Sequence, residues 1–145
     1  MKNILLLFLL TVSFPAFSQK WNTSIAEAKS IASKESKPIV LVFSGSDWCA
    51  PCIKLEKSVW QSEEFKKEAN DSWVLVKADF PKKKNNTQSE ELKAQNRALA
   101  EKYNKEGFFP LIVVLDKTGK VLGKTGFNSI KASEYISLIK SFLSK

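Results

Sequence analysis

The segment GSDWCAPC at residues 45–52 contains the only two cysteines of the chain, Cys49 and Cys52. Two thiols separated by two residues can form a redox couple, supply half of a metal site, or attach a haem. Each of these chemistries needs further residues, so the rest of the sequence distinguishes between them.

The metal and haem alternatives lack their partner residues. A structural zinc site takes about four nitrogen or sulfur ligands, and the chain has no histidine and no third cysteine. Haem attachment needs a histidine directly after the second cysteine, where this chain has Ile53. We therefore expect no zinc, no haem and no bound organic cofactor. Cu(I) held by the two thiolates remains an open alternative, and the redox couple is the favoured interpretation.

The residues around the cysteines favour redox chemistry. Pro51 suits the first turn of a helix, because the N–H that proline lacks would have no partner there. Cys49 would then lie at a helix N-terminus, where unpaired N–H groups and the helix dipole stabilise a thiolate. Cys52 follows one turn along, within reach of Cys49 but more covered. We expect Cys49 to attack a substrate disulfide and Cys52 to release the product, with Ala50 and Pro51 tuning the redox potential.

The cysteines follow a predicted buried strand. The run IVLVF at 39–43 is continuous, apolar and mostly β-branched, which is typical of a strand in the middle of a sheet. The remaining patterns predict helices and strands in the order α-β-α-β-α-β-β-α. The first predicted helix begins at Thr23 or Ser24 and ends at Lys37-Pro38, and the second covers 50–60 and resumes at Ser62. Two further helices are predicted at 89–103 and 133–143. The other predicted strands are 73–80, 110–116 and 120–127.

This order predicts an α/β fold with a mixed central sheet. Strands separated by helices pair in parallel through right-handed crossovers, whereas DKTG at 116–119 joins the last two strands as an antiparallel hairpin. Helices then cover both faces of the sheet. Active groups of such sheets lie beyond the carboxyl ends of the strands, and Cys49 is placed there.

The N-terminal residues have the pattern of a secretory signal peptide. Lys2 precedes an apolar run from Ile4 to Leu10, and the small-x-small pattern Ala16-Phe17-Ser18 follows. The run is shorter than the roughly 20 apolar residues that span a bilayer. We therefore expect residues 1–18 to be removed, residues 19–145 to form one domain, and the mature protein to be periplasmic or extracellular.

The chain is basic, with a formal net charge of +8 at pH 7. A basic balance can indicate binding to nucleic acid or to an anionic surface. The lysines are scattered without interleaved aromatic residues or arginine clusters, and the dense run Lys82-Lys83-Lys84 is typical of a solvated loop. We therefore expect no nucleic-acid partner, and a polycation that binds anionic surfaces is the weakest alternative.

The motifs carry a family resemblance. WCAPC after a buried strand, together with FFP at 108–110 opening another strand, resembles the thioredoxin-fold oxidoreductases. Four segments are similar to exported bacterial thioredoxin-like proteins: KPIVLVFSGSDWCAPCIKLEKSVW, FKKEA, VLVKADFP and LDKTGKVLG. The resemblance implies a thioredoxin fold and an enzyme that exchanges thiols with protein disulfide substrates. It also implies a reductase supplied by a membrane or thiol electron donor, and we expect a monomer.

The resemblance assigns further site residues. The proline that matches Pro110 is cis in this family and faces the cysteines, and the backbone of Phe109 before it would pair with an extended substrate segment. Trp48 would flank the site and present an apolar docking surface. From the residues alone, two interpretations of Pro110 are equally supported: a cis proline that faces the cysteines, and a proline that only starts an edge strand.

Several positions depart from the family pattern. Thioredoxins have a buried aspartate six residues before the first cysteine, and this position is Phe43; the lysine that partners the aspartate aligns with Leu75. Both losses leave Cys52 without an evident general base, so we expect a slow resolving step. Phe108 stands where glycine is common, and Leu111 replaces a threonine, which makes the rim of the site more apolar.

Two polar residues fall in apolar surroundings. Asp79 ends a predicted strand, and Asn96 lies on the apolar stripe of its helix, where a hydrogen bond to a neighbouring loop is expected. We assign neither residue to the site.

The alternative from another functional class is a binding module. A thioredoxin-fold chaperone or metal-relay protein would use the same apolar rim and the same two thiols without turnover. Reduction of insulin disulfides with a thiol donor separates the two, because it proceeds only for the enzyme.

Overall fold

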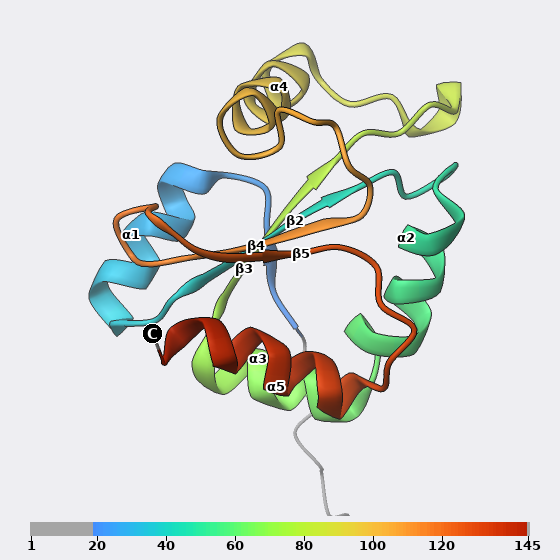
Figure 1. Ribbon diagram of the computed structural model, residues 1–145. Coiled ribbons are helices and arrows are strands. Elements are labelled where there is room, and N and C mark those ends of the chain that lie inside the picture. The colour runs from blue at the N-terminus through green and yellow to red at the C-terminus, as the bar shows by residue number, and fades with distance from the viewer. Residues whose placement is uncertain (1–18, 145) are drawn as a thin grey trace, which may run out of the picture.

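The structure is a computed structural model that describes residues 19–144 (Figure 1). The signal peptide expected at residues 1–18 lies outside these described residues. Within the described range, no helix combines the length and the apolar character that a membrane crossing requires.

The apolar run after Pro38 forms the central strand of the sheet, as predicted. This strand, β2 (Ile39–Ser44), is buried along its whole length, as expected for a strand covered on both faces. It pairs in parallel with β3 (Val74–Asp79) and antiparallel with β4 (Leu111–Leu115). In the described residues the sheet has five strands in the order β1-β3-β2-β4-β5. The edge strands are β1 (Trp21–Asn22) and β5 (Val121–Thr125).

Serine side chains begin three of the helices. Ser24, Ser62 and Ser89 each accept a hydrogen bond from the backbone N–H three residues later, which satisfies a donor that a helix N-terminus leaves free. The caps expected at Ser24 and Ser89 and the restart at Ser62 are confirmed. The helices are α1 (Ile25–Glu35), α2 (Ala50–Leu55), α3 (Glu63–Ser72), α4 (Glu90–Tyr103) and α5 (Ala132–Leu143), with a π-helical turn η1 (Glu56–Trp60) and a 3₁₀ turn η2 (Lys84–Asn86).

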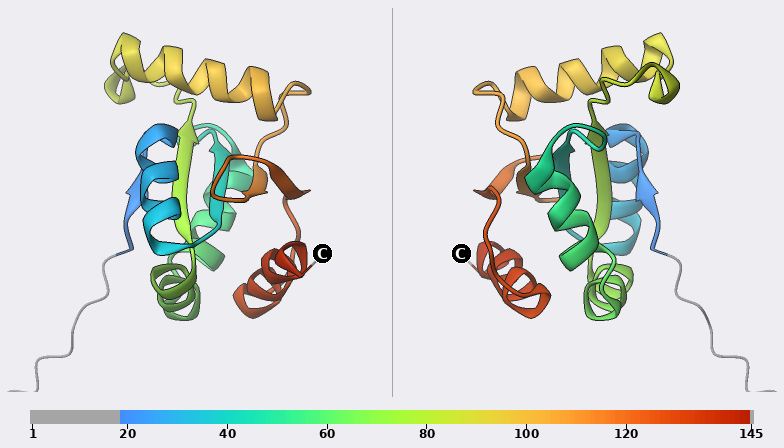
Figure 2. Two further views of the ribbon diagram at one scale, coloured as in Figure 1. Left: turned by 90° about the vertical axis from the view of Figure 1, so that its left-hand side faces the viewer. Right: turned by 90° about the vertical axis from the view of Figure 1, so that its right-hand side faces the viewer.

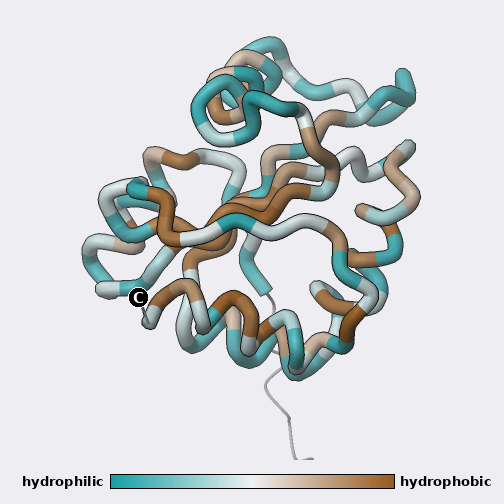
Figure 3. The backbone as a smooth tube through the Cα atoms, viewed as in Figure 1, coloured by the Kyte–Doolittle hydropathy of each residue, from teal (hydrophilic) through white to brown (hydrophobic). Residues whose placement is uncertain are grey.

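Helices cover both faces of the sheet (Figure 2), which confirms the predicted α/β architecture. The face covered by α1 and α4 contains Phe43 of β2, packed in one cluster with Leu99. The face covered by α2, α3 and α5 contains Val42, in one cluster with Leu55 and Ile139. Figure 3 shows the apolar residues concentrated along the central strands between these two layers.

The predicted element order lacks β1, a strand of two residues at the sheet edge. So short a segment carries no periodic pattern. It forms because Trp21 and Asn22 pair in parallel with Leu75 and Val76 of β3, and Asn22 Nδ2 donates a hydrogen bond to the Leu75 carbonyl at 2.9 Å. This strand therefore depends on a partner distant in the sequence.

Candidate active site

Cys49 and Cys52 form a disulfide at the start of α2. Cys49 is the N-cap residue of the helix, and its Sγ accepts a hydrogen bond from the Cys52 N–H at 3.3 Å. Its own N–H donates to the Gly45 carbonyl at 2.9 Å. Pro51 lies in the first turn, so the helix N-terminus predicted from this proline is confirmed.

The two cysteines are equally covered in this oxidised form. Each is 4% exposed, so the expectation that Cys52 is the more covered one is wrong here. The disulfide and the hydrogen bond from the Cys52 N–H both hold the Cys49 sulfur against the helix start. Between them, Ala50 is exposed and Pro51 is half-buried.

Pro110 lies at the same end of the sheet as the disulfide. The Phe109–Pro110 peptide bond is cis, as the family resemblance implies. Leu111, the next residue, pairs with Phe43 near the carboxyl end of β2, and the cysteines follow that end. The Phe109 ring lies 5.5 Å from the Trp48 ring in an edge-on arrangement. The structure therefore brings Trp48, Phe109 and Pro110 together beside the cysteines.

Aromatic side chains form the rim of this site. Trp48 is 39% exposed and Phe108 is 61% exposed. The Phe108 backbone is fixed, because the buried Asn104 side chain accepts its N–H at 2.9 Å and donates to its carbonyl at 2.8 Å. Leu111 is buried in the core, so of the two departures expected to make the rim apolar, Phe108 alone contributes there.

The sequence analysis places the missing buried acid at Phe43, and this prediction is wrong. Phe43 is fully buried on the sheet face covered by α1 and α4, whereas the helix that begins at the cysteines covers the other face. Side chains alternate along a strand, so a count that is one residue off reverses the face. The strand lysine on the side of the cysteines is Lys77, across from Val42, and Leu75 pairs instead with Val40.

An ion pair missed by the sequence analysis lies behind Cys52. A cavity of about 170 Å³ is lined by Cys52, Glu56 and Lys77 together with Ser44 and Ser46. Lys77 Nζ lies 2.7 Å from Glu56 Oε2, and both side chains are partly exposed. The cavity has room for water, through which a carboxylate can accept the proton of a thiol.

Two sequence signals could have indicated this pair. Glu56 follows Cys52 by one helical turn, which places it on the same side of the helix. Lys77 is a single charge within the otherwise apolar strand VLVKA. What the sequence could not indicate is that the two residues meet, because 21 residues separate them in the chain.

Two carboxylates join the loop before the cysteines to the loop after β3. Asp79 accepts hydrogen bonds from the N–H and the hydroxyl of Ser46 at 2.9 and 2.6 Å. Asp47 accepts the N–H groups of Lys82 and Lys83 at 2.9 and 3.0 Å and the Asn86 amide at 2.8 Å. The hydrogen bond from the Lys82 N–H, followed by that from Asn86, lowers the pKa of Asp47 below its ordinary value.

Asn96 has the role that its position predicts. Its Nδ2 donates to the carbonyl of Asp79, the last residue of β3, at 2.9 Å and to Gln88 Oε1 in the following loop at 3.4 Å, so the expected hydrogen bond to a neighbouring loop is confirmed. Neither Asn96 nor Asp79 lines the cavity behind Cys52. Both residues instead fix the polypeptide around the site.

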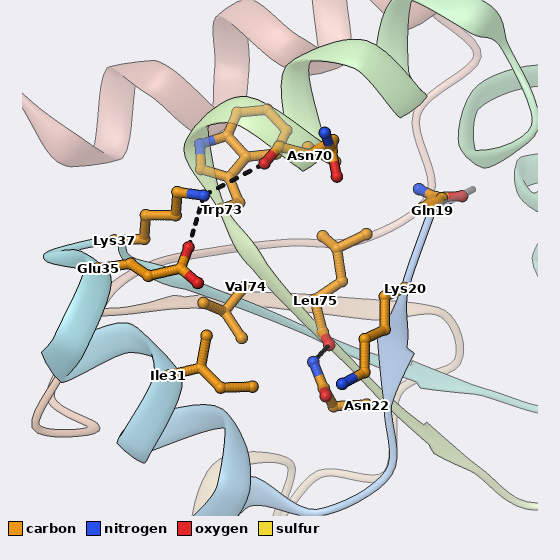
Figure 4. Close-up of a pocket in the computed structure, with 11 residues that line it drawn as sticks. Gln19, Lys20, Asn22, Ile31, Glu35, Lys37, Asn70, Trp73, Val74 and Leu75 are labelled. Carbon is orange, nitrogen blue, oxygen red and sulfur yellow. Dashed lines mark hydrogen bonds and ion pairs between the residues drawn. The ribbon is translucent and has the colours of Figure 1, made fainter. Parts of the chain in front are cut away.

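A second cavity, of about 360 Å³, lies far from the cysteines (Figure 4). It is lined by Val74 and Leu75 at the start of β3, whereas the cysteines lie beyond the carboxyl ends of the strands. Lys37 within it is paired with Glu35 at 2.7 Å. We assign this cavity no part in thiol chemistry. Among residues 19–144, no cluster of three or more histidine, cysteine or acidic side chains is arranged to hold a metal ion.

The chain is similar to proteins of known family. A family model described as thioredoxin-like matches residues 20–117, which include both cysteines and Pro110. The disulfide bond reductase DsbH of Chlamydia pneumoniae is 41% identical over 128 residues, which are 88% of this chain and 75% of that protein. The thioredoxin-related protein DsbJ of the same organism is 30% identical over 133 residues, which are 86% of this chain and 37% of that protein. A solved structure of a DsbH oxidoreductase superposes with a TM-score of 0.81 at 39% identity, covering 93% of this chain and 92% of that one.

Gly45 provides the space that the Trp48 ring occupies, and we predict that Gly45→Ala displaces this ring. A Cβ at position 45 would lie 2.3 Å from Trp48 Cε2, and the indole would lose its hydrogen bond from Nε1 to the Phe80 carbonyl. We expect a loss of about 1–3 kcal/mol in the free energy of unfolding in urea, and a shift of one indole N–H resonance in a ¹⁵N NMR spectrum.

Gly126→Ala is the matched control for this substitution. A Cβ at position 126 would meet only the Pro110 carbonyl, at an ordinary 3.7 Å. An equal loss of stability in both variants, or an unchanged indole resonance in Gly45→Ala, would contradict the predicted role of Gly45.

Proposed function

Because the chain belongs to the thioredoxin-like family, we propose that it is an exported thiol–disulfide oxidoreductase that reduces disulfides in other proteins. The observation that carries this proposal is the Cys49–Cys52 disulfide at the start of α2, with the cis Pro110 at the same end of the sheet. The similarity to a protein named disulfide bond reductase supports the direction of the reaction. The same names give no support to a chaperone or a metal relay without turnover.

In the proposed reaction, the reduced protein donates two electrons to a substrate disulfide. The Cys49 thiolate attacks one substrate sulfur, the substrate S–S bond breaks, and the other substrate sulfur leaves as a thiolate that takes up a proton. The Cys52 thiolate then attacks Cys49 Sγ and releases the second substrate sulfur. The product is the Cys49–Cys52 disulfide of this structure, which a membrane or thiol electron donor must reduce before the next cycle.

The rim is proposed to bind the substrate. The exposed rings of Trp48 and Phe108 offer an apolar surface beside the disulfide, and an extended substrate segment would pair with the backbone at Phe109, next to Pro110. The hydrogen bonds from Asn104 support this role, because they hold the Phe108 backbone in place before substrate arrives.

Glu56 is proposed to accept the proton of the Cys52 thiol. A thiol attacks only as the thiolate, and a positioned carboxylate speeds its formation near neutral pH. The cavity shared by Glu56, Lys77 and Cys52 supports this role. Lys77 would stabilise the carboxylate through its 2.7 Å ion pair and would keep it oriented toward the cavity.

Pro51 and Ala50 are proposed to keep the couple reducing. Proline has no N–H, so one of the donors that could stabilise the Cys49 thiolate at the helix start is missing. The less the thiolate is stabilised, the more the disulfide form is favoured, and the more strongly the dithiol donates electrons. Ala50 adds no polar group to this turn.

We also propose a compartment and partners for this reaction. The pattern of residues 1–18 supports export to the periplasm or beyond, where protein disulfides form and persist. The protein is proposed to act as a monomer without a bound cofactor and without nucleic acid. Its partners would be disulfide-bonded proteins and an electron donor.

Substitution of the two cysteines is predicted to block different steps of the reaction. Cys49→Ser should abolish disulfide exchange, because a hydroxyl supplies almost no anionic nucleophile at neutral pH. Cys52→Ser keeps the attacking thiol and removes the group that releases it, so mixed disulfides with exported proteins should accumulate. The measurement is non-reducing gel electrophoresis of acid-quenched cells, with the trapped proteins identified by mass spectrometry.

A metal-binding pair predicts a different outcome for the same variants. The loss of either thiolate removes one ligand of two, so both variants should behave alike. Equal, adduct-free behaviour of both variants, with Cu(I) bound only by the wild type, would overturn the oxidoreductase proposal.

Substitution of Glu56 is predicted to slow the resolving step. In Glu56→Gln, release of a preformed mixed disulfide should slow by about ten- to a hundredfold near pH 6.5. The defect should shrink above about pH 8.5, where a free thiol ionises without help. Stopped-flow measurement of product release across this pH range is the test.

Glu63→Gln is the matched control for this prediction. Glu63 is also paired with a lysine, at 3.1 Å, but it lies on the exposed surface of α3. A rate in Glu56→Gln that equals the wild type, or a defect that is the same at every pH, would exclude Glu56 as the proton acceptor.

A further inference from the structure

A basic cavity lies beside the rim of the candidate active site. It has a volume of about 390 Å³ and is formed by the loop after β3 and the first turns of α4. Among the described residues, no acidic side chain lines it. Its lining residues are Phe80, Pro81, Lys82, Lys83, Thr87, Gln88, Lys93, Asn96 and Arg97.

The positive charge of this cavity is only partly compensated. Lys93 is paired with Glu90 at 2.8 Å. Glu90 also attracts Arg97, and Asp47 attracts Lys83, but neither contact is a salt bridge among the described residues. Single exposed charges contribute little to binding. Several charges of one sign around a concave surface add up, and they attract and orient an oppositely charged partner.

The loop that carries the lysines is held in place. Asp47 accepts hydrogen bonds from the N–H groups of Lys82 and Lys83, and Gln88 Nε2 donates to the Asp79 carbonyl at 3.1 Å. The loop expected to be merely solvated is therefore exposed but anchored, and Figure 3 shows it as a hydrophilic segment beside α4. An anchored site loses less conformational entropy when a partner binds.

The cavity is continuous with the aromatic rim of the disulfide site. Phe80 lines the cavity, and its ring lies 5.4 Å from the Phe109 ring. Lys82 Nζ lies 3.8 Å from the centroid of the Trp48 ring, and Trp48 directly precedes Cys49. A partner whose disulfide contacts Cys49 would therefore have neighbouring residues within reach of the cations.

The position of the cavity favours a polypeptide as the occupant. The cavity adjoins the aromatic rim, so a segment bound in it would lie close to a disulfide that reacts with Cys49. The cations that line it need acceptors, and the side-chain carboxylates of an acidic polypeptide supply them.

We propose that this basic cavity binds an acidic segment of the protein whose disulfide reacts with Cys49. The inference rests on the proposed function, because it names the class of partner that the disulfide site would take. Partners with aspartate or glutamate near their disulfide would be preferred over neutral ones. The preference would weaken with salt, since the charges are exposed.

The test uses two disulfide-bonded peptides that differ only in the residues flanking the cysteines, which are Asp and Glu in one and Asn and Gln in the other. The full-length mature protein should reduce the acidic peptide with a KM about tenfold lower at low salt. The variant Lys83→Gln/Lys93→Gln/Arg97→Gln should lose this preference and keep its activity on the neutral peptide. Lys82 is left in place because it contacts Trp48.

The control variant removes the same charge from the other end of the sheet. Lys117 and Lys120 flank the β4–β5 turn, which follows Leu115, the residue paired with Ile39 at the start of β2. Lys34 is exposed at the end of α1. Lys34→Gln/Lys117→Gln/Lys120→Gln should retain the preference for the acidic peptide. A loss as large as in the cavity variant would show that net charge alone matters and would overturn the inference.

A binding measurement separates this inference from the proposed function. An acidic peptide with serine in place of cysteine cannot react, and calorimetry should show that it binds the wild type about tenfold more tightly than the cavity variant. Reduction of both peptides with equal KM, without such binding, would overturn the acidic site and leave the reductase standing. Binding without reduction of either peptide would support the site and overturn the reductase. Equally tight binding of an oligonucleotide or of anionic phospholipid vesicles at the same cations would show unselective attraction of anions and would also overturn the inference.

Discussion

The parallel register of β2 and β3 is the constraint on which the site depends. It pairs Ser44 with Asp79, so the chain leaves both strands at the same edge and the two following loops lie side by side. Asp79 and Asp47 then join these loops through hydrogen bonds to Ser46 and to the N–H groups of Lys82 and Lys83. A slip of one residue would turn every side chain of one strand to the opposite face. The disulfide, the cation cavity and the aromatic rim would then no longer share one surface.

The same register decides which charged groups lie near Cys52. Val42 and Lys77 are paired on the face of the cysteine helix α2, and Glu56 comes from the π-helical turn η1 that continues this helix, not from a strand. A lone buried charge would be costly, and this arrangement avoids that cost because Lys77 and Glu56 are paired and partly solvated. The proposed proton acceptor of the Cys52 thiol therefore does not come from β2, which stays apolar at Val42.

Local signals predicted much of the fold and of the site. The cysteine spacing, Pro51, the serine caps and the continuous apolar strands all act within a few residues, so the disulfide position and the mixed sheet follow from the sequence. Features made by distant residues could not be predicted in this way. The two residues of β1 form a strand only against Leu75 and Val76. The lysines after β3 line a cavity only because α4 packs beside their loop and adds Arg97. Counting back from Cys49 leads to Phe43 as the position of the missing acid, but such a count does not reveal which face of β2 a residue occupies.

If Cys49 and Cys52 form a reducing thiol couple, their equilibrium with glutathione will favour the disulfide. The mature protein would be incubated in buffers of graded glutathione ratio, quenched with acid, and analysed for the fraction of disulfide. We expect a potential near the roughly −270 mV of thioredoxin. A potential near the roughly −120 mV of a strong oxidant such as DsbA, or the absence of any reversible conversion between dithiol and disulfide, would contradict it.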